Sequence, residues 1–247
     1  NNFKKKFMNY LLLKSITKKL IKSKNVYNIF PESGIIYVHI PKTGGTSIRK
    51  LLVNLKNNDV LNNDKKKYYY CEELKRRKIS SIHGKARDYL EFIEQDLWSK
   101  SLKFASVRNP WDLMVSSYHW WLQNGNKFDR LKNMYLDISK MNFEEYLKSS
   151  YGANMINECV GNIEDWFLDK DKNFILDGLV RLEHFENDFL KLIQKSNKKI
   201  YNFSDLPKEN VTKRKEYQFY YNNHTSLLIE ERFKFLIDYC GYKYDDI

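Results

Sequence analysis

The stretch Ile35–Leu55 constrains the fold more than any other part of this 247-residue chain. Residues 35–40 form a short apolar, β-branched run that is long enough for one buried strand. Pro41 ends the strand, because proline cannot donate to a sheet ladder. A helix is then expected, whose buried stripe at helical spacing comprises Ile48, Leu51, Leu52 and Leu55.

The loop between this strand and this helix, PKTGGTS, predicts an anion site. Gly44 and Gly45 are expected to turn the backbone with positive φ, and Thr46 or Ser47 to cap the helix. A glycine-rich turn at a helix N-terminus aims free N–H groups and the positive end of the helix dipole at one point. The candidate contacts to a phosphate-like group are Lys42, Thr43, Gly44, Gly45, Thr46 and Ser47.

The same loop is distinct from that of nucleotide kinases. Their pattern, G-x-x-x-x-G-K-[ST], places lysine after the glycines, whereas Lys42 precedes them. PKTGGTS instead resembles the 5′-phosphosulfate-binding loop of sulfotransferases that use 3′-phosphoadenosine 5′-phosphosulfate (PAPS). Taken alone, the loop also fits an ordinary strand-to-helix turn with a surface lysine.

A second strand-to-helix junction lies in SLKFASVRNPWDLMVSSYHWWLQNG. Residues 102–107 predict a strand, and Asn109, Pro110 and Asp112 are typical of a helix start that Asn124-Gly125 later ends. The segment R-N-P-x(5)-S-x-Y resembles the 3′-phosphate-binding motif of the same sulfotransferases. This resemblance assigns Arg108 and Ser116 to the 3′-phosphate, and two motifs in the right order are more specific than one.

The resemblance extends over residues 35–245. LVRLEHFENDF, with an expected strand at 177–182 and a helix at 185–194, resembles the R-x-E-x-x-x-x-D-F region of carbohydrate-type and bacterial sulfotransferases. LPKENVTKRKEYQFYYNN resembles their loop that closes over the cofactor, with Thr212 in the usual serine position and Arg214 in the basic position. A final helix is expected from Ser226 to Tyr239.

A candidate catalytic base lies in KISSIHGKARDYLEF. His83 would follow a short strand at 79–82, and position alone fits a structural histidine; His39 is expected to be structural. Uronyl 2-O-sulfotransferases carry a catalytic histidine in an H-G-x segment at the matching place, so the resemblance implies that His83 is the base. Those enzymes often have a second histidine two residues on, where this chain has Lys85.

The amino-acid composition indicates which kinds of ligand and cellular compartment suit the chain. Lys and Arg exceed Asp and Glu by 43 to 31, a net charge of +12, which suits an anionic ligand. The three cysteines are isolated, which favours a reducing compartment, and a cytoplasmic location is expected. No apolar run approaches the ~20 residues that span a bilayer, although the start at Asn1 leaves a trimmed N-terminal anchor open. The basic residues 1–28 predict a docked helix or a peripheral membrane contact.

Together these features predict a three-layer, P-loop-like α/β fold with a mainly parallel central sheet flanked by helices. Residues 1–30 are expected to form a basic arm and 31–247 a single domain. The implied activity moves a sulfuryl group from PAPS to an acceptor hydroxyl, on an acidic glycan or glycolipid, with Lys42 and His83 catalytic and without a metal or nucleic acid. Two roles, acceptor binding or packing in the core, are considered for Trp120, Trp121 and Trp166. The alternatives are a nucleotide kinase, a nucleic-acid-binding protein and a non-catalytic scaffold with this fold.

Overall fold

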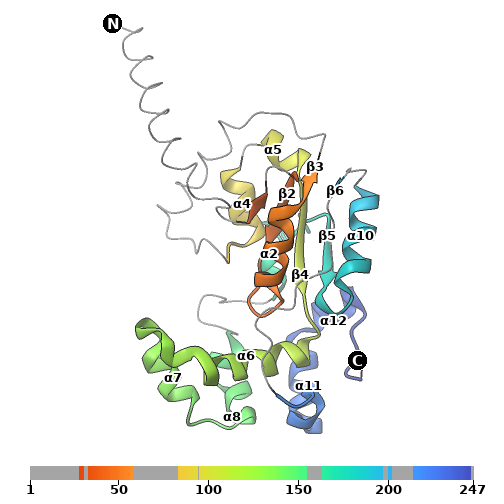
Figure 1. Ribbon diagram of the computed structural model, residues 1–247. Coiled ribbons are helices and arrows are strands. Elements are labelled where there is room, and N and C mark those ends of the chain that lie inside the picture. Colours follow the sequence, from red (N-terminus) through yellow and green to blue (C-terminus); the bar gives the residue numbers. More distant parts are fainter. Residues whose placement is uncertain are drawn as a thin grey trace, which may run out of the picture.

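The computed structural model describes residues 28–30, 33–57, 83–93, 95–154, 163–196, 200–201 and 214–245 (Figure 1). Several expectations fall outside these residues: the basic arm before residue 28, the strand at 79–82 and the closing loop up to Thr212. They therefore stay predictions. Among the described residues, no helix has the length and apolar character needed to cross a bilayer.

The central sheet has four strands in the order β1-β2-β4-β5. The first pair is antiparallel, and β2, β4 and β5 run parallel, with Ile35 opposite Leu102 and Phe104 opposite Gly178. The short β3 and β6 form a separate antiparallel pair. The strands are β1 (Ile29–Phe30), β2 (Ile35–Val38), β3 (Lys56–Asn57), β4 (Leu102–Val107), β5 (Gly178–Arg181) and β6 (Ile200–Tyr201).

Alternate residues of β2 point to opposite faces of the sheet and join two separate cores. Ile35 and Tyr37 pack in one core with α2 (Gly45–Asn54) and α10 (Phe185–Lys195). Ile36 and Val38 pack in the other core with helices that include α4 (Ala86–Phe92) and α6 (Pro110–Asn124). The expected three-layer fold, with a mainly parallel sheet between helices, is thereby confirmed.

Helix α6 crosses the end of the sheet at which β4 finishes, with α7 and α8 on one side and α11 on the other (Figure 1). Its predicted start is confirmed: the Asn109 side chain accepts hydrogen bonds from the N–H groups of Trp111 and Asp112. The remaining helices are α5 (Gln95–Lys100), α7 (Lys132–Ile138), α8 (Phe143–Lys148), α9 (Ser150–Ala153), α11 (Asn223–Arg232) and α12 (Lys234–Cys240), with 3-10 turns at Gly125–Lys127, Asp129–Leu131, Ile163–Trp166, Leu182–His184 and Tyr217–Tyr220.

Two predictions about helix ends are wrong. Helix α2 is capped by Gly44 in the left-handed conformation (φ 80°), without a side-chain cap from Thr46 or Ser47. The single C-terminal helix is two helices, because the backbone leaves helical geometry at Phe233 (φ −110°, ψ 22°), whose side chain is buried in the core. The stripe predicted for α2 is confirmed, since Ile48, Leu51, Leu52 and Leu55 are all buried.

Candidate active site

The predicted phosphate loop follows β2 and is held by a chain of buried hydroxyl groups. The Thr43 hydroxyl donates to the Ile40 carbonyl (2.8 Å) and lies 2.7 Å from Ser106 Oγ, which lies 2.5 Å from the Tyr37 hydroxyl. Because each hydroxyl has one proton, the order of donation is Tyr37 to Ser106 to Thr43 to Ile40. The Thr43 hydroxyl therefore ties the loop to β2 and β4.

Positive φ angles occur at Lys42 (66°) and Gly44 (80°), rather than at the two glycines expected. A lysine in this conformation is uncommon and stores strain that the surrounding contacts must hold. Gly44 has a second constraint, since a Cβ there would lie 2.4 Å from Leu182 Cδ1. The turn that brings the start of α2 to the carboxyl end of β2 thus depends on two residues in the left-handed region.

Arg108 joins the two predicted motifs. Its side chain, at the end of β4, donates from Nη1 to the Lys42 carbonyl (3.1 Å) and to Ser116 Oγ on α6 (3.1 Å). The sequence placed Arg108 and Lys42 at one edge of the sheet, and the structure confirms this. Since Ser116 accepts from Arg108, its own proton is left to donate to an anion. Lys42, Arg108 and Ser116 therefore belong to one site.

Asp112 links Arg108 to a distant part of the chain. Its Oδ2 accepts from Arg108 Nε at 2.7 Å and lies 2.6 Å from Nη2, and its Oδ1 pairs with Arg214. The carboxylate offsets the repulsion between two guanidinium groups that both lie in the field of Lys42. The sequence predicted Asp112 only as a first-turn residue of α6. Its role between two arginines depends on a contact across 102 positions and left no local signal.

The surroundings of Lys42 change the pKa of its amine. Burial, followed by the charges of Arg108 and Arg214, lowers the pKa of its amine from 10.5 to about 7. Its Nζ also lies 5.5 Å from the centre of the Trp120 ring, within cation–π range. With this pKa the amine is only partly charged near neutral pH, and a bound anion would favour its charged form.

His83 lies before α4 and contacts His39, which precedes the phosphate loop. Its Nδ1 is 3.0 Å from the main-chain oxygen of His39, and the two imidazole rings are 4.6 Å apart between centres. A carbonyl can only accept, so Nδ1 carries the proton and Nε2 carries the lone pair. This tautomer allows Nε2 to accept a proton.

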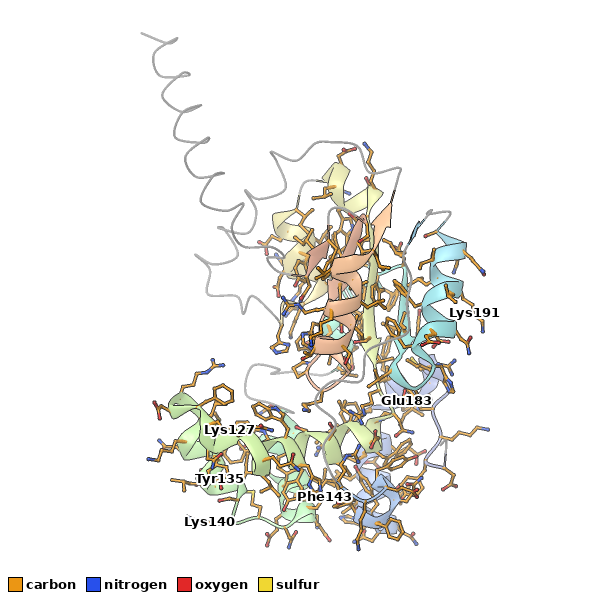
Figure 2. The ribbon with its side chains drawn as sticks, viewed as in Figure 1. Lys127, Tyr135, Lys140, Phe143, Glu183 and Lys191 are labelled. Carbon is orange, nitrogen blue, oxygen red and sulfur yellow. The ribbon has the colours of Figure 1, made fainter. Side chains whose placement is uncertain are left out.

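A polar junction fixes the end of β4 against the C-terminal segment. The Asn109 N–H donates to Glu183 Oε1 (2.8 Å), and the Tyr242 hydroxyl donates to Glu183 Oε2 (3.1 Å). Asn109 Nδ2 also donates to the Lys243 carbonyl (3.2 Å). Figure 2 shows Glu183 at the start of α10, close to α6. The strand end that carries Arg108 is thus held from two sides.

The remaining residues that were predicted to contact a ligand differ in how far they are exposed. Thr46 is exposed on the first turn of α2, whereas Ser47 is buried. Trp121 and Trp166 are core residues, and of the three tryptophans considered as acceptor contacts only the half-buried Trp120 lies beside Lys42. Across the described ranges, no group of three or more His, Cys, Asp or Glu side chains could hold a metal ion.

A comparison with protein-family models matches residues 25–165, more than half of the chain, to the sulfotransferase family. The matched region contains the phosphate loop, His83 and the Arg108–Ser116 segment. Comparisons with curated proteins and with solved structures returned no match.

Proposed function

Because the chain belongs to the sulfotransferase family, we propose that it transfers a sulfuryl group from PAPS to an acceptor hydroxyl. Family membership supports sulfuryl transfer in general; PAPS as the donor is the finer proposal. The observation that carries it is the Arg108 side chain, which bonds to both the Lys42 carbonyl and Ser116. A ligand with phosphate groups at two separated positions, as in PAPS, suits a site in which two anion-binding motifs are joined.

The chemistry of the donor set fits this ligand. Lys42 and the N–H groups at the start of α2 would hold the 5′-phosphosulfate, and Lys42 would offset the charge that develops on the leaving phosphate. Arg108 and Ser116 would hold the 3′-phosphate, with Arg214 assisting from the C-terminal segment. PAPS supplies the activated sulfuryl group, and the protein supplies position and charge.

His83 is the proposed general base. Its Nε2 would take the proton of the acceptor hydroxyl while the hydroxyl oxygen bonds to sulfur and the sulfur–oxygen bond to the 5′-phosphate breaks. The products are a sulfate ester and adenosine 3′,5′-bisphosphate, so atoms and charge balance without a further reactant. The hydrogen bond from Nδ1 to the His39 carbonyl keeps the ring in the tautomer that this step needs.

The proposed acceptor is a carbohydrate or glycoconjugate, of an acidic glycan or glycolipid type. The net charge of +12 favours an anionic acceptor, and the half-buried Trp120 beside Lys42 is an aromatic surface of the kind that binds sugar rings. Uronyl specificity rests on the His83-Gly84 resemblance alone. The family match favours this account over the kinase and nucleic-acid alternatives.

The test is incubation of the protein with PAPS and a panel of desulfated acidic glycans and glycolipids, with release of adenosine 3′,5′-bisphosphate and the mass of the sulfated product as readouts. We expect transfer to at least one glycan, and loss of about 10²–10⁴-fold in rate for His83→Ala. The exposed histidine variant His224→Ala is the control and should keep the full rate. Transfer from ATP rather than PAPS would contradict the proposal.

A further inference from the structure

The His39 side chain lies between the two halves of the site. It follows β2 directly and is buried, with 8% of its surface exposed. Its ring stacks on Tyr37 (centres 5.7 Å apart, planes at 16°) and contacts the ring of His83 (4.6 Å, 48°). Tyr37 is in turn fixed by its hydrogen bond to Ser106. The His39 ring is therefore packed against Tyr37, and it contacts the His83 ring as well.

The same ring occupies the space beside Gly45. A Cβ at Gly45 would lie 1.8 Å from His39 Nε2 and 2.1 Å from Cδ2, far closer than atoms can approach. The backbone of Gly45 is not in the left-handed region, so its conformation alone does not require glycine. The missing side chain at Gly45 is explained by the His39 ring, which rests on the start of α2.

The main chain of His39 acts on His83 as well. Its carbonyl accepts a hydrogen bond from Nδ1 of His83, which fixes the tautomer of that ring. The His39 ring contacts the same imidazole, so one residue acts on His83 in two ways. The residue that presents this carbonyl also has its ring seated between Tyr37 and Gly45. A second imidazole thus adjoins His83, even though position 85, where the resemblance places one, holds lysine.

His39 works as a neutral ring. Burial, followed by the charges of His83, Arg49 and Lys42, holds its pKa well below the usual value. Among the described residues, its Nδ1 has no hydrogen-bond partner. A charged imidazole here would add a cation beside Lys42 and Arg49, so an uncharged contact suits the site.

We infer that His39 is a positioning residue whose ring, seated between Gly45 and His83, sets the base against the phosphate loop. This inference rests on the proposed function and adds to it the residue that fixes the relation between donor site and base. It explains why the loop needs a glycine at a position with ordinary backbone geometry.

The first test uses compensation between His39 and Gly45, with adenosine 3′,5′-bisphosphate as the titrated probe. Gly45→Ala should lower the affinity about ten- to hundredfold, because the methyl group clashes with the ring. Adding His39→Ala, or His39→Asn as a second choice if alanine reduces folding, makes room for that methyl group and should restore most of the affinity. If the double variants bind as weakly as Gly45→Ala alone, the methyl group clashes with the ligand instead, and the inference is wrong.

The second test reads the His83 tautomer by ¹⁵N NMR of the five imidazole rings, with the His83 signals assigned by their loss in His83→Ala. In the wild type we expect His83 with its proton on Nδ1. In folded His39→Ala this form should give way to a mixture of both tautomers, whereas His224→Ala should leave it unchanged. An unchanged His83 tautomer in His39→Ala would overturn the inference.

The proposed function and the proposed role of His39 can be refuted separately. A wild-type protein that binds no bisphosphate refutes the proposed donor, while the NMR test of His39 still gives a result. Normal wild-type binding combined with no rescue and no tautomer change refutes only the role of His39.

Discussion

The amine of Lys42 is expected to gain a proton when the ligand binds. In the free protein, burial and the neighbouring arginines lower its pKa to about 7, so the amine is largely neutral at pH 8. A bound phosphate favours the charged form and raises this pKa. Above pH 7, where the phosphate groups of adenosine 3′,5′-bisphosphate are already ionised, its affinity should therefore fall by up to about tenfold per unit as the pH rises. Titration calorimetry at pH 8 in two buffers of different ionisation enthalpy should reveal proton uptake.

Lys42→Arg is the matched variant for this prediction. Arginine stays charged above pH 7, so ligand binding to this variant should be independent of pH in that range and should take up no proton at pH 8, even if the altered shape weakens it. Proton uptake that persists in Lys42→Arg would show that another group titrates.

The hydroxyl of Ser106 should contribute measurably to stability. Ser106→Ala leaves the buried hydroxyl groups of Tyr37 and Thr43 without their shared partner, which should cost about 1–3 kcal/mol in the free energy of unfolding. Thr43 still donates to the Ile40 carbonyl, whereas the Tyr37 hydroxyl loses its acceptor. Adding Tyr37→Phe removes that unpaired hydroxyl, so the double variant should lose less than the sum of the two single variants. Denaturant unfolding measures all three, and strictly additive losses would show that the three hydroxyls do not act as a chain.

At the scale of elements, the α6 start is the junction on which the site is built. Asn109→Ala removes the cap of α6 and the contact with the Lys243 carbonyl, and should cost about 1–2 kcal/mol in the free energy of unfolding. Asn109→Asp keeps the capping oxygen and should lose less. Urea unfolding of the three proteins provides the comparison, and an Asn109→Ala protein of wild-type stability would contradict this account of the junction.

The elements that were predicted accurately carry their signals locally. Strand β4 and helix α6 have the predicted bounds, because a mainly apolar run, a capping Asn109, Pro110 and the Asn124-Gly125 end lie within the segment itself. The cap of α2 was wrong because the left-handed turn at Gly44 replaced a side-chain cap. The break between α11 and α12 was not predicted, because the residue at the break is Phe233, which is neither glycine nor proline and is buried.

At the scale of the whole molecule, some site residues were predicted from local motifs, whereas others depend on contacts between distant parts of the chain. Lys42, Arg108 and Ser116 followed from two motifs at strand ends, which a parallel sheet brings to one edge. The contacts of His39 with His83 and of Asp112 with Arg214 were not predictable, because in each pair the two residues lie far apart along the chain. The motifs therefore predicted the candidate ligand-binding residues, while the residues that hold them in place are specified by tertiary packing.

Binding should also stabilise the molecule as a unit. The proposed ligand contacts come from the phosphate loop, from α6 and from Arg214, which meet only in the folded chain. Adenosine 3′,5′-bisphosphate at about 100 times its Kd should therefore raise the free energy of unfolding by about 2.7 kcal/mol. Thermal unfolding with and without the ligand measures this, and adenosine alone serves as the control. An unfolding temperature that does not respond to a ligand shown to bind would mean that the unfolded chain binds it equally well, and would contradict a site assembled by folding.

The central claim is that the two anion-binding motifs form one PAPS site joined by Arg108. Calorimetric titration of adenosine 3′,5′-bisphosphate into the wild type, Arg108→Ala and the exposed-surface control Arg130→Ala tests it most directly. We predict one-to-one binding to the wild type and the control, with a loss of about tenfold or more in Arg108→Ala. Equal binding by all three proteins, or no binding to the folded wild type, would contradict the claim.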